Sequence, residues 1–263
     1  MTSSERELLA AHDVARVRAD NPGPLTLTGT NSWLVGRDPC WVVDPGPAIG
    51  GHRDELLAAA GARGGIGGIA ITHDHGDHGD LAAELADTAG GVPVLAARHE
   101  AATGRVGDGD AAGPMRVFVV PGHAPDHLCF GFGGVCFTGD AVLGEGSVFL
   151  WPDPGALGGY LDALARLRTE RFELLACGHG PLVQDPDAKL ASYIAHRLER
   201  ERSVVAALKR GTRSVEGMLD EAWSDVPELL RPAAALTLAA HLDKLEDEGQ
   251  LPDGVERPHV PTL

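Results

Sequence analysis

The chain has 263 residues, of which 43% are hydrophobic, which is enough for one large domain or for one domain with a small appendage. Its 22 basic and 38 acidic side chains give a formal net charge of −16, which disfavours a polyanionic partner unless basic residues cluster locally. No run of about 18 apolar residues occurs, so we expect no membrane partner. The N-terminal segment lacks the apolar stretch of a secretory signal, so we expect a cytoplasmic protein.

Short strands and helices alternate through the first part of the chain. Between Gly-, Pro- and Asn-containing turns, strands are predicted at residues 25–28, 32–35 and 40–44. A short helix is predicted over residues 53–62, followed by a glycine-rich loop over 61–68. The apolar run 69–72 is typical of a buried strand, and a helix over 81–86 follows.

The next hundred residues continue this alternation. Strands are predicted at residues 92–95, 117–120, 128–132 and 135–138, and the last two flank Gly133-Gly134, which predicts a hairpin. Leucines at helical spacing indicate a helix over 157–167, and 174–177 is one more strand. Strands interleaved with helices indicate an α/β sandwich with helices outside packed sheets.

The character of the sequence changes near Pro186, so we divide the chain into residues 1–186 and residues 187–263. The second part has predicted helices at 188–209, at 214–223, where Ser214 is the expected cap, and at 233–248. A Pro-rich tail follows. This order suggests a small three-helix or winged-helix-like domain.

The four cysteines give no sign of a structural zinc knuckle. They form no Cys-x-x-Cys pair, and all have apolar neighbours, so we expect buried free thiols. The four residues are Cys40, Cys129, Cys136 and Cys177.

Three histidines and one aspartate fall within six positions, in the run Thr-His-Asp-His-Gly-Asp-His-Gly at residues 72–79. Imidazole nitrogens and carboxylate oxygens are the usual zinc ligands. Alternation places His73 and His75 on one side of an extended segment, and a turn at Gly76 directs Asp77 and His78 to a second point. The segment therefore predicts two neighbouring metal ions. The competing interpretation is a solvated loop that is rich in His and Asp.

Three later residues complete the predicted site. His123, Asp140 and His179 each follow an apolar run and lie beside a glycine, where α/β folds place site residues. We assign Asp140 as the carboxylate that bridges the ions, because such a bridge holds two metals about 3.5–4 Å apart. The first ion is assigned to His73, His75 and His123, and the second to Asp77, His78 and His179.

Two further polar residues have weaker signals. Asp44 ends a strand, and it is either an outer-shell acceptor for a ligand histidine or the first residue of an Asp-Pro-Gly turn. His127 is predicted to be structural or outer-shell. The remaining histidines lack ligand spacing and are treated as ordinary residues: His12, His52, His99, His196, His241 and His259.

The His-x-His-x-Asp-His run, followed by His123, Asp140 and His179, resembles the metallo-β-lactamase superfamily. The resemblance covers about residues 24–182, and it implies an αββα sandwich with two zinc ions at one edge. His75 stands where the redox di-iron branch has Glu, which favours zinc hydrolysis. Further segments resemble the group that contains the endoribonuclease β-lactamase-like protein 2, which implies a winged-helix-like C-terminal domain. These segments are residues 26–36, 139–146, 178–181, 193–197 and 241–246.

Three functions compete on these observations. The first is a two-zinc hydrolase that uses a metal-bridging hydroxide on a small or acyl substrate of ester or thioester type, with Asp77 and Asp140 as catalytic residues. The second, implied by the resemblance, is an endoribonuclease whose partner is single-stranded RNA. It needs a basic groove. Residues 187–263 carry 10 basic and 14 acidic side chains, a net of −4, and a basic stripe there is the alternative to a solvated helix face. The candidate stripe comprises Arg197, Arg200, Arg202, Lys209, Arg210 and Arg213.

The third function is that of a binding protein with a vestigial metal site.

Overall fold

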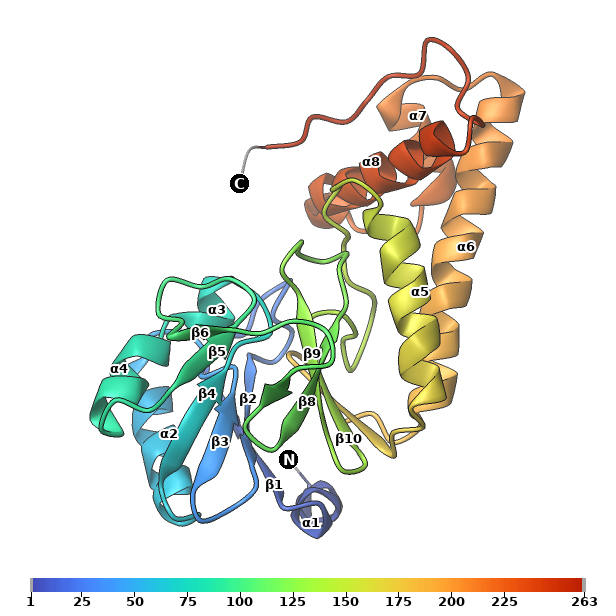
Figure 1. The fold of residues 1–263 in the computed structure, drawn as a ribbon. Coiled ribbons are helices and arrows are strands. Elements are labelled where there is room, and N and C mark those ends of the chain that lie inside the picture. The colour runs from blue at the N-terminus through green and yellow to red at the C-terminus, as the bar shows by residue number, and fades with distance from the viewer. Residues whose placement is uncertain (1, 262–263) are drawn as a thin grey trace.

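The computed structural model describes residues 2–261. Two sheets stack face to face, helices cover the outer face of each, and further helices follow at the C-terminal end (Figure 1). The four layers have the αββα arrangement that the resemblance implied.

The first sheet has six strands in sequential order, β1-β2-β3-β4-β5-β6. The pairs β1–β2 and β2–β3 are antiparallel, whereas the pairs from β3 onwards are parallel. The parallel arrangement brings the carboxyl ends of β3 and β4 to the same edge. The strands are β1 (Val14–Arg18), β2 (Asn31–Val35), β3 (Cys40–Val43), β4 (Ile66–Ala70), β5 (Val94–Ala96) and β6 (Gly104–Arg105).

The second sheet has five strands in the order β11-β10-β9-β8-β7. The predicted hairpin at Gly133-Gly134 is confirmed, because β9 and β10 pair antiparallel with Phe132 opposite Val135. Strand β11 joins β10 in parallel after a helical crossover. The strands are β7 (Ala111–Ala112), β8 (Met115–Val119), β9 (Leu128–Phe132), β10 (Val135–Gly139) and β11 (Leu174–Cys177).

Helices α2, α4, α5 and α6 form the outer layers, with α5 and α6 side by side against the second sheet (Figure 1). Helix α1 packs against β1, α3 lies after β4, and α7 and α8 pack on the far end of α6. The helices are α1 (Ser3–Ala11), α2 (Gly50–Gly61), α3 (Gly76–Gly79), α4 (Ala82–Thr88), α5 (Ala156–Thr169), α6 (Pro186–Arg210), α7 (Val215–Ala222) and α8 (Arg231–Asp247), with a 3-10 turn, η1 (Glu228–Leu230), before α8.

Alternating side chains on the strands build the layered core. On β2, Trp33 points into the cluster between the sheets, whereas Leu34 points into the cluster beneath α2 and α4. Because successive residues of a strand face opposite sides, one buried strand serves two core layers. Trp33 meets Phe137 of the opposite sheet at 6.0 Å between ring centroids.

Helix α6 belongs to two hydrophobic clusters. Near its start, Leu190 and Tyr193 pack in the cluster beneath the second sheet. Farther along, Val204 and Leu208 pack with α7 and α8 in a separate cluster. The helix therefore ties the sandwich to the C-terminal helices, and the division of the chain at residue 186 stays a prediction.

One strand prediction is wrong. Residues 25–28 form a loop whose only ladder contact is the isolated bridge between Gly23 and Leu27. The alternating Leu-Thr pattern does not form a strand here, because Leu27 has a φ of +54° and breaks the extended backbone. The sequence also gave no prediction for α1 and β1, and β4 begins at Ile66, inside the expected glycine-rich loop.

All four cysteines are buried free thiols, as predicted. None of the helices between residues 2 and 261 combines the length and the hydropathy that a bilayer crossing requires.

Candidate metal centre

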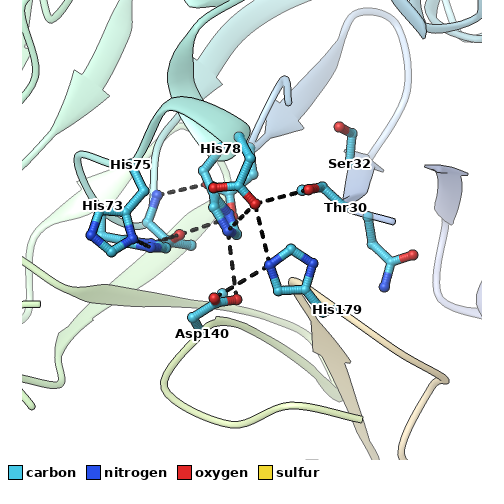
Figure 2. A network of polar contacts seen from close by, with 12 residues as sticks. Thr30, Ser32, His73, His75, His78, Asp140 and His179 are labelled. Atoms are coloured by element: carbon cyan, nitrogen blue, oxygen red, sulfur yellow. Dashed lines mark hydrogen bonds and ion pairs between the residues drawn. The ribbon is translucent and has the colours of Figure 1, made fainter. Parts of the chain in front are cut away.

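The loop after β4 carries the first four predicted ligands into one edge of the sandwich. The expected extended segment is wrong for His73, which lies in a bend closed by the hydrogen bond from His75 N to His73 O, whereas His75 has an extended backbone; Gly76 then begins the single turn of α3, which carries Asp77 and His78. His73 Nε2 lies 2.9 Å from His75 Nδ1. Figure 2 shows the rings of His73, His75 and His78 converging near Asp140.

The three later residues reach the same point from the second sheet. His123 follows β8, Asp140 follows β10 and His179 follows β11, so all three come from strand ends at one edge. His123 Nε2 lies 3.2 Å from His75 Nδ1. His179 Nε2 lies 3.3 Å from Asp77 Oδ2. The structure therefore brings all seven predicted residues together.

Asp140 lies at the centre of the cluster. Its Oδ2 is 3.3 Å from His179 Nε2 and 3.7 Å from His123 Nε2, and its Oδ1 is 3.5 Å from His78 Nε2. Metal-ligating atoms group in three sets within 4.8 Å. They are His73 with His75 and His123, His73 with His78 and Asp140, and Asp77 with His78 and His179.

The donor atoms fit divalent cations. His78 Nε2 and Asp140 Oδ1 are buried and have no hydrogen-bond partner among the described residues. Buried polar atoms are rarely left unpaired, so these two atoms, 3.5 Å apart, fit a shared cation. The nitrogen and oxygen donor set is the one that zinc prefers. The arrangement is compatible with a dinuclear site.

Comparisons with known proteins agree with this geometry. A Caenorhabditis elegans protein named Beta-lactamase-like protein 2 homolog is 30% identical over 95% of this chain and 88% of its own length. The sequence model of the metallo-beta-lactamase superfamily matches residues 106–179. The chain belongs to the metallo-beta-lactamase superfamily. It is thus a metal-dependent hydrolase by family and fold.

Two further similarities extend this result. A Beta-lactamase domain protein of known structure from Burkholderia ambifaria is 22% identical, with a TM-score of 0.74 over 92% of this chain and 90% of that one, which supports the fold. An Aspergillus chevalieri protein named Atrochrysone carboxyl ACP thioesterase is 32% identical over 82% of this chain and 74% of its own length. Residues 218–252 match the Beta-lactamase associated winged helix domain, so the C-terminal part is a winged-helix domain.

A buried carboxylate orients one imidazole of this metallo-beta-lactamase site. Asp44 Oδ2 accepts a hydrogen bond from His78 Nδ1 at 2.9 Å, which leaves Nε2 directed at Asp140. Thr72 holds the same carboxylate through its backbone N–H and its hydroxyl, each at 2.8 Å. Of the two readings that the sequence left open for Asp44, the outer-shell contact is the one present.

Residues that sequence reasoning missed hold the other side of the site. Thr30 donates its hydroxyl to Asp77 Oδ2 at 3.0 Å, and Asn21 holds Thr30 through two hydrogen bonds. His127, expected to be structural or outer-shell, accepts a hydrogen bond from the Asp140 backbone at 3.1 Å. Thr30 lies in the segment 26–36, which resembles the family. That resemblance was the one feature of the sequence that could have pointed to Thr30 as a site residue.

Close packing leaves no room for a side chain at Gly178. A Cβ there would lie 2.5 Å from Asp140 Oδ1 and 2.7 Å from His78 Cε1. The strand end before His179 can therefore pass directly behind Asp140 and His78 only because this residue is glycine.

The pKa values of the cluster depend on which imidazoles lie beside its carboxylates. Burial lowers the pKa of His78, but Asp140 and two other carboxylates outweigh it and raise the pKa to about 9. Burial likewise lowers the pKa of His179, but hydrogen bonds to Asp140 and Asp77 raise it to about 10. Burial raises the pKa of Asp77, but His179 and His78 bring it down to about 2. The pKa of His73 lies well below its usual value, because of burial and the neighbouring imidazoles. The carboxylates thus hold negative charge where cations would bind.

A cleft of about 840 Å³ opens on the cluster and extends to the C-terminal helices. His75, Asp77 and Asp140 lie at its inner end. The walls come from the loop at residues 24–27, the loop at 143–149, and faces of α6 and α8. The metallo-beta-lactamase fold and the winged-helix domain therefore form this cleft together.

Helix α6 fixes the loop at residues 143–149 by a regular set of contacts. Lys189, Tyr193 and Arg197, spaced four residues apart, donate to the backbone carbonyls of Gly144, Gly146 and Val148. Phe149 O in turn lies 3.3 Å from His123 Nδ1. One face of a helix thereby supports both the cleft wall and a predicted ligand.

Five of the six residues of the predicted basic stripe are buried or paired, and Lys209 is exposed. Arg197 is buried, Arg200 forms a bidentate ion pair with Asp225, and Arg202 pairs with Glu199. Arg210 pairs with Glu221, and Arg213 donates to backbone carbonyls. The solvated, paired helix face is the interpretation that fits these contacts.

Proposed function

We propose that the protein is a two-zinc hydrolase of esters or thioesters with a small or acyl substrate. The observation that carries this proposal is the continuous, largely apolar cleft that opens directly on the seven-residue His and Asp cluster. A concave, mostly apolar site with a few convergent polar groups is typical of small-molecule binding. The similarity to a protein named as a carboxyl ACP thioesterase supports the acyl substrate class.

The two cations would be held by His73, His75 and His123 on one side and by Asp77, His78 and His179 on the other, with Asp140 between them. When bound, such ions supply an acidified water and a Lewis acid for the substrate oxygen. Water adds across the acyl C–O or C–S bond, which yields a carboxylic acid and an alcohol or thiol.

Asp77 is the carboxylate best placed to act on the reacting water. Its side chain is 28% exposed, against 10% for Asp140, so it faces the cleft while Asp140 lies beneath. Thr30 fixes Asp77 Oδ2 by donating its hydroxyl. A fixed, ionised carboxylate can accept a proton from water and orient its oxygen toward the acyl carbon.

The distribution of charge disfavours the endoribonuclease alternative. Phosphate contacts supply most nucleic-acid affinity, so a ribonuclease needs free cations beside its metals. The cationic side chains lining the described cleft are Arg197 and Arg200, which are engaged by Val148 O and by Asp225. RNA as a partner therefore enters the test as an alternative outcome.

The deciding experiment compares three substrate classes with the purified protein. Acyl esters, acyl thioesters and a labelled single-stranded RNA are incubated with and without zinc and a chelator. We expect zinc-dependent turnover of esters or thioesters, loss of turnover in His75→Ala and Asp140→Ala, and two metal ions per chain by elemental analysis. His12→Ala, a histidine outside the cluster, is the matched control. Cleavage of RNA alone would replace this function by the nuclease, and no turnover by the metal-loaded protein would favour a binding role.

A further inference from the structure

The cleft has apolar side chains at both its ends. At the metal end, Leu27 lies over Gly180, next to His179, and the Phe149 ring centroid is 4.8 Å from that of His123. Val226 and Leu230 line the cleft from the segment that leads into α8. Leu25 is 56% exposed, so a large apolar surface faces the cleft without a protein partner. Burial of such surface by a ligand is favourable at roughly 25 cal/mol per Å².

Leu27 is held in a conformation that leucine rarely adopts. Its φ of +54° is in the left-handed region, which is unfavourable for a branched, bulky side chain. The Leu27 side chain lies over Gly180. A Cβ atom at residue 180 would lie only 3.1 Å from Leu27 Cδ1. Backbone strain of this kind clusters at functional sites, because surrounding structure must maintain it. Leu27 thus packs beside His179 and lines the cleft at the same time.

The charged groups of the cleft are arranged so that its interior holds no free cation. Arg200 is paired with Asp225, and Arg197 is buried against Val148 O. Burial and the neighbouring Arg197 lower the pKa of His196 to about 4, so this imidazole is neutral at pH 7. Glu145 adds an exposed carboxylate at the rim. An anionic or phosphorylated substrate tail would find no cationic partner among these residues.

We propose that the cleft binds an uncharged, medium-to-long acyl chain, with the reacting carbonyl at the metal cluster and the far end of the chain against Val226 and Leu230. This inference rests on the proposed function. Leu27 and Leu230 are the specificity-determining residues: Leu27 packs on the first carbons of the chain, and Leu230 packs on the last.

A chain-length series tests the proposal with matched variants. Acetyl, butyryl, octanoyl and dodecanoyl esters and thioesters are compared by kcat/KM, which we expect to rise about two- to fourfold per added methylene until the cleft is filled. Leu230→Asn should lower kcat/KM about tenfold for the dodecanoyl substrate and leave the acetyl substrate within twofold. Leu230 is only half-buried and is not part of the hydrophobic cluster of the C-terminal helices, so the variant should fold. Leu229→Asn is the control, because Leu229 is 73% exposed and is not part of the cleft lining.

Leu27→Gly separates function from folding. Glycine adopts positive φ without strain, so the melting temperature should be unchanged or higher, while kcat/KM falls by a similar factor for the butyryl, octanoyl and dodecanoyl substrates, which all contact Leu27 with their first carbons. Binding of dodecanoate, measured by calorimetry, gives a readout that does not depend on turnover. It should be weaker in Leu230→Asn and unchanged in Leu229→Asn.

The outcomes distinguish the inference from the proposed function. A flat chain-length profile with metal-dependent turnover of the acetyl ester would overturn the acyl-chain site and leave the hydrolase intact. Absence of all ester and thioester turnover would remove the hydrolase, and dodecanoate binding would then decide the apolar site by itself. Equal dodecanoate affinity in both asparagine variants would overturn the assignment of Leu230.

Discussion

Replacing Asp44 by Asn should weaken metal binding without moving the backbone. Asp44 is buried and has a φ of +51°, a region that asparagine also adopts. Its Oδ2 accepts from His78 Nδ1 at 2.9 Å and from the Thr72 hydroxyl at 2.8 Å. In the variant the amide oxygen takes the place of Oδ1 and keeps the hydrogen bond from the Thr72 backbone N–H. The NH₂ group then takes the place of Oδ2. The NH₂ group donates to His78 Nδ1, so the proton of the imidazole moves to Nε2, which then has no lone pair for a cation.

The magnitude follows from the contacts that change. Loss of an outer-shell partner of a metal-binding histidine typically costs about 10–100-fold in metal affinity. In the variant the Thr72 hydroxyl loses its carboxylate acceptor, and a hydrogen bond to a charged group is worth about 1.5–3 kcal/mol. Removing one such bond should therefore lower the melting temperature of the metal-free protein by about 3–12 °C, since about 2–4 °C correspond to 1 kcal/mol in a chain of this size.

Competition with a chromophoric chelator measures the zinc affinity, and calorimetry measures the melting temperature. Asp126→Asn is the control with the same chemical change. Asp126 Oδ2 accepts a hydrogen bond from the Asp74 backbone N–H at 2.9 Å, next to His73 and His75. Unlike Asp44, it bonds a backbone N–H and not an imidazole nitrogen. If the Asp44→Asn protein binds two zinc ions with unchanged affinity, the orienting role of Asp44 is wrong.

Three further predictions concern packing and metal. Gly178→Ala should abolish zinc binding, because its Cβ would lie 2.5 Å from Asp140 Oδ1. Gly158→Ala, in open space on α5, should leave zinc binding intact and raise the melting temperature. A zinc titration and a thermal melt of both variants check this. Tyr193→Phe should cost about 1–2 kcal/mol in urea unfolding, because the hydroxyl bonds both Leu143 N and Gly146 O, and an unchanged midpoint would contradict this role. Removal of metal by a chelator should lower the melting temperature, and added zinc should restore it in a concentration-dependent way; a melt indifferent to zinc would argue against the site.

The sequence alone predicted which seven His and Asp side chains gather at one point, and part of the reason is local. Four of its seven residues lie within six positions, where backbone geometry fixes their relative placement. His123, Asp140 and His179 each end an apolar strand beside glycine, and strand ends of packed sheets meet at one edge. Helix α5 followed from leucines at helical spacing, and helix α6 was predicted where the character of the sequence changes near Pro186.

The substrate cleft and the state of the arginines depend on contacts that periodicity does not encode. Leu27 alternates with Thr residues as a strand residue would. In the structure, however, Leu27 has a left-handed backbone, and its side chain packs over Gly180, far along the chain. Arg197 looks like part of a basic stripe, but it is buried against Val148, 49 residues away. Local pattern fixes which side chains can bind a metal, because ligand spacing is a property of a few neighbouring residues. The shape and charge of the space beside them arise only when distant segments pack, because each wall of the cleft comes from a different part of the chain.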